Sequence, residues 1–291
     1  MSSRLAELAA SAARQAKAAT ARALSQPAVG SLISLALRDR IRSFGVVIDT
    51  SPAAFTPAVK AQIAFGIYES AEIRFIRAHL AGFSRVLELG SSLGVTTSHI
   101  LDVAAPGAEV VCVEANPRLL EALTATAAAA AARAGATVRA IHGAVGVAPG
   151  EPSATTSLAL GRSSLCSRVV PDASGERHPR VPVVDLADLA GGWPDYAVVC
   201  DIEGAEAALI QAAEPVLTRA RRLVIELHDT VSEQGPVTAG DLRAGLLGLG
   251  FVPIAEKGRV LALDGPASRV PRQAGGPARA GHRQNEGQDH G

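Results

Sequence analysis

Five short apolar runs, separated by longer segments with helical periodicity, limit what this chain can fold into more than any other feature. They read RVLEL (85–89), EVVCV (109–113), TVRAI (137–141), YAVVC (196–200) and RLVIEL (222–227). A strand that is apolar at nearly every position is buried on both faces, as in a parallel sheet with helices on either side. The alternation predicts an α/β fold with a doubly wound, Rossmann-like sheet.

Boundary signals place further elements around these runs. Asn116 as N-cap, Pro117 at the first helical position and Gly135 at the end predict a helix between the second and third runs. The segment 68–80 has helical spacing, and we expect it to pack over the sheet edge above the ligand site. Near the C-terminus, FVPIAEKGRVLAL predicts a hairpin that adds an antiparallel edge.

The stretch 146–195 does not follow the alternation, and a connection of this length is usually functional. TTSLAL (155–160) and VPVV (181–184) are expected as short strands, with SSLCSR (163–168) as a loop between them. The chain as a whole is long enough for one sizeable core. We expect a helical extension over 1–67, the α/β domain over 68–264 and a disordered tail over 265–291.

Charge and cysteine content set further expectations. Lys and Arg total 28, as do Asp and Glu, so there is no electrostatic reason to expect a nucleic-acid or membrane partner. No segment resembles a signal peptide or a membrane span. Cys112 and Cys200 lie in apolar runs, which favours reduced thiols in a cytoplasmic protein. We expect the alanine-rich N-terminal helix to lie on the surface or to contact a second copy of the chain. Whether the protein forms a homo-oligomer is left open.

The first apolar run leads into a glycine turn and a helix, VLELGSSLGVTTSHIL, an arrangement that lets backbone approach a nucleotide-like ligand. A dinucleotide-binding GxGxxG motif would need glycines at 92 and 95, where the chain has Ser92 and Val95. The motif present consists of Glu88, Gly90 and Gly94. Its acid suits a cationic or hydroxyl-bearing ligand better than a pyrophosphate.

The second run ends in Glu114, a carboxylate placed to accept hydrogen bonds from both hydroxyls of a ribose. An adenosine-type ligand without phosphates fits both acids, and S-adenosylmethionine is that ligand. HGAVG after the third run puts His142, Gly143 and Ala144 beside the adenine, although His142 can equally be a loop histidine that satisfies backbone groups. The predicted cofactor-binding residues are Glu88, Gly90, Ser91, Gly94, Glu114, Ala115, Gly143, Ala144 and Asp201.

The fourth run breaks into acids, VVCDIEGAE, at its carboxyl end. Ligands bind outside the carboxyl ends of strands in a doubly wound sheet, so Asp201 and Glu203 are expected at the mouth of the cofactor site, where a methyl group would be delivered. Spare charges at the end of a core strand are costly, which favours a functional role for both. Glu206 is interpreted as a capping acid in the first turn of the next helix.

Together these motifs make the sequence resemble the FkbM-type family of class I S-adenosylmethionine-dependent methyltransferases. The resemblance runs from about residue 68 to 263 and rests on VLELGSSLGVTT, VVCVEANPRLLEAL, HGAVG, VPVVDLADL, DIEGAE and LVIELHD. DIEGAE is the most specific of these. The resemblance implies a seven-stranded, mostly parallel sheet with one antiparallel strand. It also implies S-adenosylmethionine as donor and, usually, O-methylation of a hydroxyl on a sugar or other small natural product.

For the chemistry, His228 in LVIELHDT is the candidate general base, oriented by Asp229 or Glu226. A structural loop histidine bonded to Asp229 is the alternative. Asp201 and Glu203, the other predicted catalytic residues, could orient the acceptor hydroxyl or the methionine amino group. A divalent cation held by Asp201, Glu203 and His228 is chemically allowed, although no close-spaced ligand motif supports it, so no metal site is predicted.

Several alternatives stay open at this level. The polar residues of the irregular stretch belong to the acceptor side or to a solvated loop; they are Ser163, Ser164, Arg168, Arg177, His178 and Arg180. A non-catalytic nucleoside-binding protein of the same fold also fits the motifs. An NAD-dependent reductase is disfavoured by Ser92 and Val95. The acceptor molecule, and whether oxygen or nitrogen receives the methyl group, do not follow from the sequence.

Overall fold

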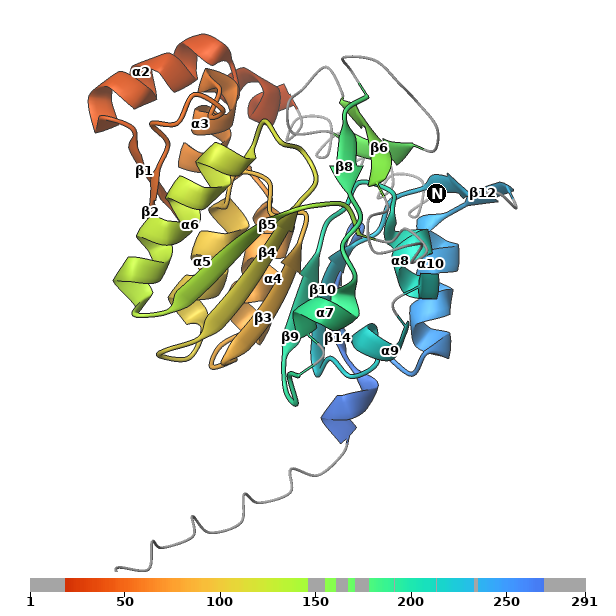
Figure 1. Cartoon of the computed structure of the whole chain (residues 1–291). Coiled ribbons are helices and arrows are strands. Elements are labelled where there is room, and N and C mark those ends of the chain that lie inside the picture. Colours follow the sequence, from red (N-terminus) through yellow and green to blue (C-terminus); the bar gives the residue numbers. More distant parts are fainter. Residues whose placement is uncertain are drawn as a thin grey trace, which may run out of the picture.

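The computed structural model describes residues 19–145, 155–160, 167–170, 178–190, 192–212, 214–232 and 235–269. At its centre is a seven-stranded sheet with the order β13-β14-β10-β9-β3-β4-β5 (Figure 1). Its strands are β3 (Arg85–Leu89), β4 (Glu109–Glu114), β5 (Thr137–His142), β9 (Ala197–Cys200), β10 (Arg222–Glu226), β13 (Val252–Lys257) and β14 (Val260–Asp264). Only β14 runs antiparallel to its neighbours in this sheet. The predicted doubly wound α/β fold, with its C-terminal antiparallel hairpin, is confirmed.

Helices cover both faces of this sheet, which is why its inner strands are mostly apolar and buried. One face carries α4 (Ser70–His79), α5 (Val95–Val103) and α6 (Leu120–Ala134), and the other carries α7 (Leu186–Ala190), α8 (Glu206–Ala212), α9 (Glu214–Leu217) and α10 (Ala239–Gly248). Strand β9 shows the division: Ala197 and Val199 join the first core, while Val198 and Cys200 join the second.

The predicted start of the helix after β4 is wrong by about one turn. Helix α6 begins at Leu120, and Asn116 lies before it, where its side-chain Oδ1 accepts a hydrogen bond from the backbone N–H of Arg118 at 3.0 Å. Asn116 therefore caps a turn that leads into the helix. Gly135 ends α6 in the left-handed conformation, with φ of 62°, as predicted.

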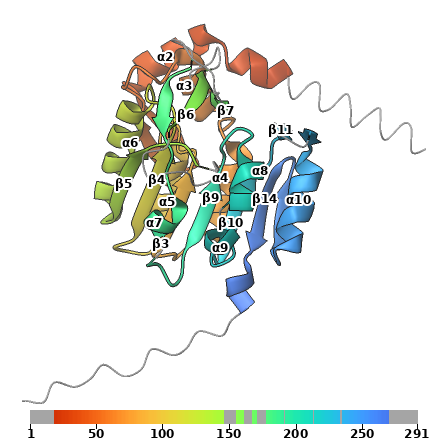
Figure 2. The same ribbon diagram turned by 45° about the vertical axis from the view of Figure 1, so that its right-hand side comes forward.

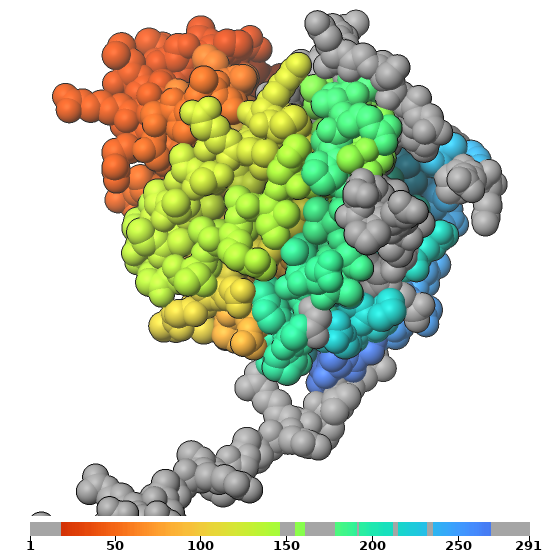
Figure 3. Space-filling view, in the orientation of Figure 1, coloured from red at the N-terminus to blue at the C-terminus, as the bar shows by residue number. Residues whose placement is uncertain are grey.

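The N-terminal segment packs onto the α/β domain. It contains α2 (Pro27–Leu37), β1 (Arg40–Ser43), β2 (Val46–Asp49) and α3 (Pro57–Ala64), so its described part holds a hairpin as well as helices. Ile41, Ile48 and Phe55 share a buried core with Leu93 and Leu119 of the domain. Figure 3 shows this segment in red and orange against the yellow part of the domain. The rest of the predicted N-terminal helix, residues 1–18, lies outside the described residues.

A small sheet of order β7-β6-β8 stands at the same end of the central sheet as the N-terminal segment (Figures 1 and 2). Its strands are β6 (Thr155–Leu160), β7 (Ser167–Val170) and β8 (Arg180–Pro182). The two predicted strands here are confirmed. The predicted loop is wrong at its end, because Ser167 and Arg168 pair with β6; residues 161–166 are not among those described.

The remaining elements complete the C-terminal part. Strands β11 (Thr230–Ser232) and β12 (Gly235–Val237) form a hairpin, and η1 (Pro266–Arg269) is a 3₁₀ turn at the start of the segment predicted as a tail. Residues 270–291 of that segment are outside the description. Within the described part of the chain, no helix has the length and hydropathy to cross a membrane.

The carboxyl ends of β3 and β9 meet in a very close backbone contact. Gly90 has a φ of +84°, and a Cβ at this position would lie 1.7 Å from the carbonyl oxygen of Asp201. The backbone N–H of Asp201 in turn donates to the carbonyl of Leu89 at 2.9 Å, and that of Gly90 donates to Val113 at 2.9 Å. Position 90 therefore requires glycine for space as well as for conformation.

We expect Gly90→Ala to lower the free energy of unfolding by about 3 kcal/mol or more, because a left-handed residue and an overpacked contact each cost about 1 to 3 kcal/mol. Gly82→Ala is the matched control. Its φ is +77°, but a Cβ there would meet no atom within 4 Å, so it should lose only the conformational share. Urea denaturation measures both variants, and equal losses would contradict the steric account.

Candidate active site

A cavity of about 430 Å³ opens at the carboxyl ends of β3, β4, β5 and β9. Its wall also includes Thr56 and Val59 from the N-terminal segment, Tyr68 and Glu69 before α4, and Leu158 of the small sheet. The volume is in the range of sites that enclose a small molecule or cofactor. The cavity thus lies where ligands bind in doubly wound sheets.

One end of the cavity brings together most of the residues predicted to bind a cofactor. Gly90, Glu114, Ala115, Gly143 and Ala144 all line it. The buried carboxylate of Glu114 accepts hydrogen bonds from the backbone N–H groups of Asn116 at 2.6 Å and Ser92 at 2.8 Å. Burial raises the pKa of Glu114, and these two bonds oppose the rise. Each carboxylate oxygen keeps lone-pair capacity for a further donor.

Glu88 lies outside the cavity lining, at 1 % exposure. Its carboxylate accepts hydrogen bonds from the hydroxyls of Thr96 at 2.6 Å and Thr97 at 2.5 Å, both in the first turn of α5. Burial raises its pKa, while those bonds oppose the rise. Ser91 and Gly94 are likewise absent from the lining. These three predicted residues hold the turn in place and do not reach the cavity themselves.

The ring of His142 contacts the backbone and not the predicted position of the adenine. Its Nε2 lies 3.2 Å from the carbonyl oxygen of Ala115, which ties the end of β5 to the loop after β4. Of the two interpretations open from the sequence, this contact favours a histidine that satisfies a backbone group.

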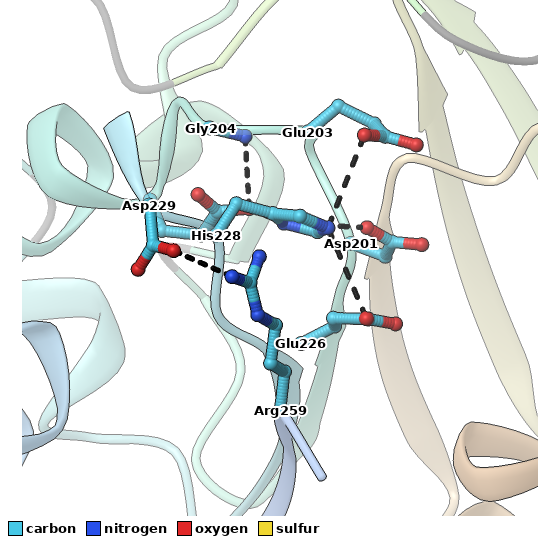
Figure 4. A network of polar contacts seen from close by, with 8 residues as sticks. Asp201, Glu203, Gly204, Glu226, His228, Asp229 and Arg259 are labelled. Carbon is cyan, nitrogen blue, oxygen red and sulfur yellow. Dashed lines mark hydrogen bonds and ion pairs between the residues drawn. The ribbon is translucent and has the colours of Figure 1, made fainter. Parts of the chain in front are cut away.

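The other end of the cavity is acidic. Glu69, Asp201 and Glu203 line it, whereas Glu72, Glu206, Glu226 and the predicted base His228 belong to the same acidic cluster but are not part of the lining. Figure 4 shows the ring directed toward Asp201, Glu203 and Glu226. The predicted catalytic residues Asp201, Glu203 and His228 are therefore brought together. Their ligand atoms lie within 4.8 Å of one another.

His228 is oriented by Glu206. Its Nδ1 lies 2.9 Å from Oε1 of Glu206, which also accepts from the backbone N–H of Gly204 at 3.2 Å. Burial lowers the pKa of His228. The hydrogen bond with Glu206 and the negative charges of Glu206, Asp201 and Glu203 outweigh this effect and raise the pKa to about 9. The imidazole is thus protonated at neutral pH when no other cation is bound nearby.

The predicted partner Asp229 does not orient His228. It points away from the ring, accepts from the backbone N–H of Ala239 at 2.9 Å, and pairs with Arg259 at 2.5 Å (Figure 4). Glu226, the other predicted partner, lies 3.9 Å from Nε2, too far for a hydrogen bond. Glu206, interpreted from the sequence only as a capping acid, is the residue that orients His228.

Sequence reasoning missed Glu69 and Glu72, which enter the acidic cluster from the start of α4. Burial, together with the charges of Glu226 and Glu203, raises the pKa of Glu69 to about 7. Burial and the neighbouring carboxylates raise the pKa of Glu72 and Asp201 well above their ordinary values. The acids of YESAE were visible in the sequence, but acids at the start of a helix are typical of capping and give no sign of a site.

Three non-glycine residues that line the cavity have left-handed backbone. They are Glu69, Ser92 and Glu203, with φ of 42°, 47° and 53°. This conformation costs about 1 to 2 kcal/mol for an ordinary residue, and it tends to persist where a site requires it. The observation supports a functional role for this cavity.

Of the polar residues in the irregular stretch, Arg180 is exposed. It donates to the hydroxyl of Thr155 at 2.8 Å and to its carbonyl at 3.0 Å, so it ties β8 to β6. Ser163, Ser164 and Arg177 are outside the described residues, as is the side chain of Arg168. His178 is described but has no hydrogen bond or ion pair that would link it to the cavity.

No family model matches the chain, and no curated protein matches it. Among solved structures, it is similar to a protein of the NADB-Rossmann superfamily from Streptococcus agalactiae, at 11 % identity and a TM-score of 0.36, over 67 % of each chain. It is also similar to 1,6-didemethyltoxoflavin-N1-methyltransferase from Burkholderia thailandensis, solved with S-adenosylhomocysteine, at 16 % identity and 0.36, over 67 % of this chain and 76 % of that chain.

A putative tRNA (m1A22) methyltransferase from Streptococcus pneumoniae, solved with S-adenosylmethionine, is similar at 12 % identity and a TM-score of 0.36. The match covers 70 % of this chain and 76 % of that one. At identities below 25 % and TM-scores below 0.5, these likenesses assign neither an activity nor a substrate to this chain.

In protein treated with EDTA, we expect the side chain of His228 to titrate near pH 9 in an NMR experiment. Glu206→Gln should lower that pKa by about one unit or more, because the imidazolium loses the carboxylate that stabilises its charge. Asp229→Asn is the matched control at the next residue, and it should leave the value nearly unchanged. A pKa near 6.5 in the unaltered protein would contradict the described contact.

Proposed function

We propose that this chain is an S-adenosylmethionine-dependent methyltransferase that methylates a hydroxyl on a sugar or other small natural product, as the FkbM-type resemblance implies. The observation that carries the proposal is a single cavity with two unlike ends. One end has glycines and a carboxylate suited to a nucleoside, and the other has an excess of acids suited to a positively charged group.

The donor fits the first end. Glu114, with spare lone pairs directed at the cavity, would accept from the ribose hydroxyls. Gly143 and Ala144 are small residues of the cavity wall and would lie against the adenine. In this proposal Gly90, Ala115 and Asp201 also contact the donor, whereas Glu88, Ser91 and Gly94 hold the turn beneath it.

The reaction would take place where the two ends meet. The acceptor oxygen loses its proton to a carboxylate of the acidic cluster, because the imidazole of His228 already carries a proton at neutral pH, and forms a bond to the methyl carbon. The carbon–sulfur bond breaks, and the sulfonium becomes the neutral thioether of S-adenosylhomocysteine. The protein holds the acceptor oxygen about 3 Å from the methyl carbon, in line with the sulfur, and removes the proton. Asp201 and Glu203, at the end of β9, would hold the acceptor.

The acidic cluster supports a small acceptor. The three carboxylates that line one end of the cavity would repel the phosphates of a nucleic acid, and no excess of basic residues offsets them in the chain as a whole. A neutral hydroxylated molecule, or one that carries positive charge, is compatible with that end.

Two other functions fit less well. A nicotinamide dinucleotide would place its pyrophosphate at the turn after β3, where Ser92 replaces the motif glycine and Glu114 lies bonded to its backbone. A nucleoside-binding protein without catalysis would still leave the strained, acid-rich acceptor end unexplained. Turnover of the donor separates this last alternative from a methyltransferase.

The proposal predicts saturable one-to-one binding of S-adenosylmethionine and S-adenosylhomocysteine in calorimetric titration. Glu114→Ala should weaken both by at least tenfold, a loss of about 1.4 kcal/mol. Glu109→Ala is the matched control, because Glu109 lies at the opposite end of the same strand and is partly exposed. If the folded protein binds neither ligand, the methyltransferase proposal is wrong.

A further inference from the structure

We propose that the acidic end of the cavity is a divalent-cation site in which Asp201, Glu203 and Nε2 of His228 are the ligands. The existence of the site does not depend on methyl transfer. Only its role in the reaction rests on the proposed function.

The spacing of these groups suits ligands of one ion. Nε2 of His228 lies 3.9 Å from Oε2 of Glu203, too far for a hydrogen bond. Bonds of about 2.1 Å in octahedral geometry put adjacent ligand atoms roughly 3 Å apart and opposite ones roughly 4.2 Å apart. The observed separation falls between these values.

His228 is held as a metal-ligating histidine usually is. One ring nitrogen, Nδ1, lies 2.9 Å from the fully buried carboxylate of Glu206, while Nε2 faces Glu203 and Glu226. A carboxylate behind the imidazole fixes the ring and keeps the proton on the nitrogen that faces away from the metal. Glu206 therefore explains both the direction of the ring and the availability of Nε2.

A second and independent observation is a buried carboxylate without a partner. Glu72 is 3 % exposed and makes no hydrogen bond or ion pair with any described residue. Its carboxylate lies in a set with Glu69 and Asp201 whose oxygens are within 4.8 Å of one another. Oδ1 of Asp201 is also buried without a hydrogen-bond partner.

The acids of this cluster are not balanced by an equal number of positive charges. Within the described part of the chain, the ion pairs of these acids involve His228 alone, one possible positive charge against six possible negative ones. Buried charges are otherwise paired or bound to a metal. A divalent cation in contact with Asp201 and Glu203 would supply what the protein's own side chains do not.

The ligand set indicates the kind of ion. Two carboxylates and one imidazole, with no thiolate, suit Mg²⁺ or Mn²⁺ whose remaining ligands are water or substrate. In the proposed reaction such an ion would take the acceptor hydroxyl as a further ligand and lower its pKa. His228 would then act as a ligand, with the cation in place of the proton on Nε2, and the released proton would pass to a carboxylate outside the ligand set.

The test is a calorimetric titration of EDTA-treated protein with MnCl₂, with and without S-adenosylhomocysteine. We expect one saturable site, weakened about tenfold or more by Glu203→Gln and by His228→Ala. Electron paramagnetic resonance of the bound Mn²⁺ should show coupling to an imidazole nitrogen that is lost in His228→Ala. Asp229→Asn, beside His228 but paired with Arg259, should bind within about threefold of the unaltered protein.

Circular dichroism confirms that each variant is folded before titration. No saturable binding in either condition would overturn the inference, as would affinities unchanged in both ligand variants. Failure here is distinct from failure of the proposed function, because donor binding is measured separately on metal-free protein.

Discussion

The contact between Gly90 and the carbonyl of Asp201 determines the geometry of everything at this end of the sheet. There is no space for a side chain between the ends of β3 and β9. The glycine turn that faces a nucleoside and the acids that face an acceptor are consequently held side by side. Backbone hydrogen bonds from Gly90 to β4 and from Asp201 to β3 also fix the position of Glu114, at the end of β4, relative to these residues. The two ends of the cavity are adjacent because three neighbouring strands end together.

The two ends differ in how their charges are satisfied. Glu114 has two backbone N–H donors, so its negative charge is stabilised without any ligand. Asp201 has a buried oxygen without a partner, and Glu72 has no partner among the described residues. Charge that the protein leaves uncompensated is charge available to a ligand. The nucleoside end is therefore ready-formed, whereas the acidic end is completed by what binds to it.

The sheet could be predicted because its strands are apolar runs whose ends are marked by glycine, proline and acids. The grouping of Asp201, Glu203 and His228 followed from parallel strands that end at one edge. What the sequence could not give were contacts between distant segments. Glu69 reaches the cluster from the position just before α4, 132 residues before Asp201. Glu206, at the start of α8, contacts His228, which follows β10. Glu88 has the residue type and spacing expected of an acid that binds the cofactor. Its carboxylate is instead bonded to the hydroxyls of Thr96 and Thr97, in the first turn of α5.

A structure of the protein with S-adenosylhomocysteine tests the central claim most directly, since it locates the donor without knowledge of the acceptor. The account predicts that both ribose hydroxyls lie within hydrogen-bond distance of Glu114. It also predicts adenine against Gly143 and Ala144, and a sulfur atom directed toward Asp201 and Glu203. A ligand bound with its sulfur away from the acidic end, or outside this cavity, would contradict it.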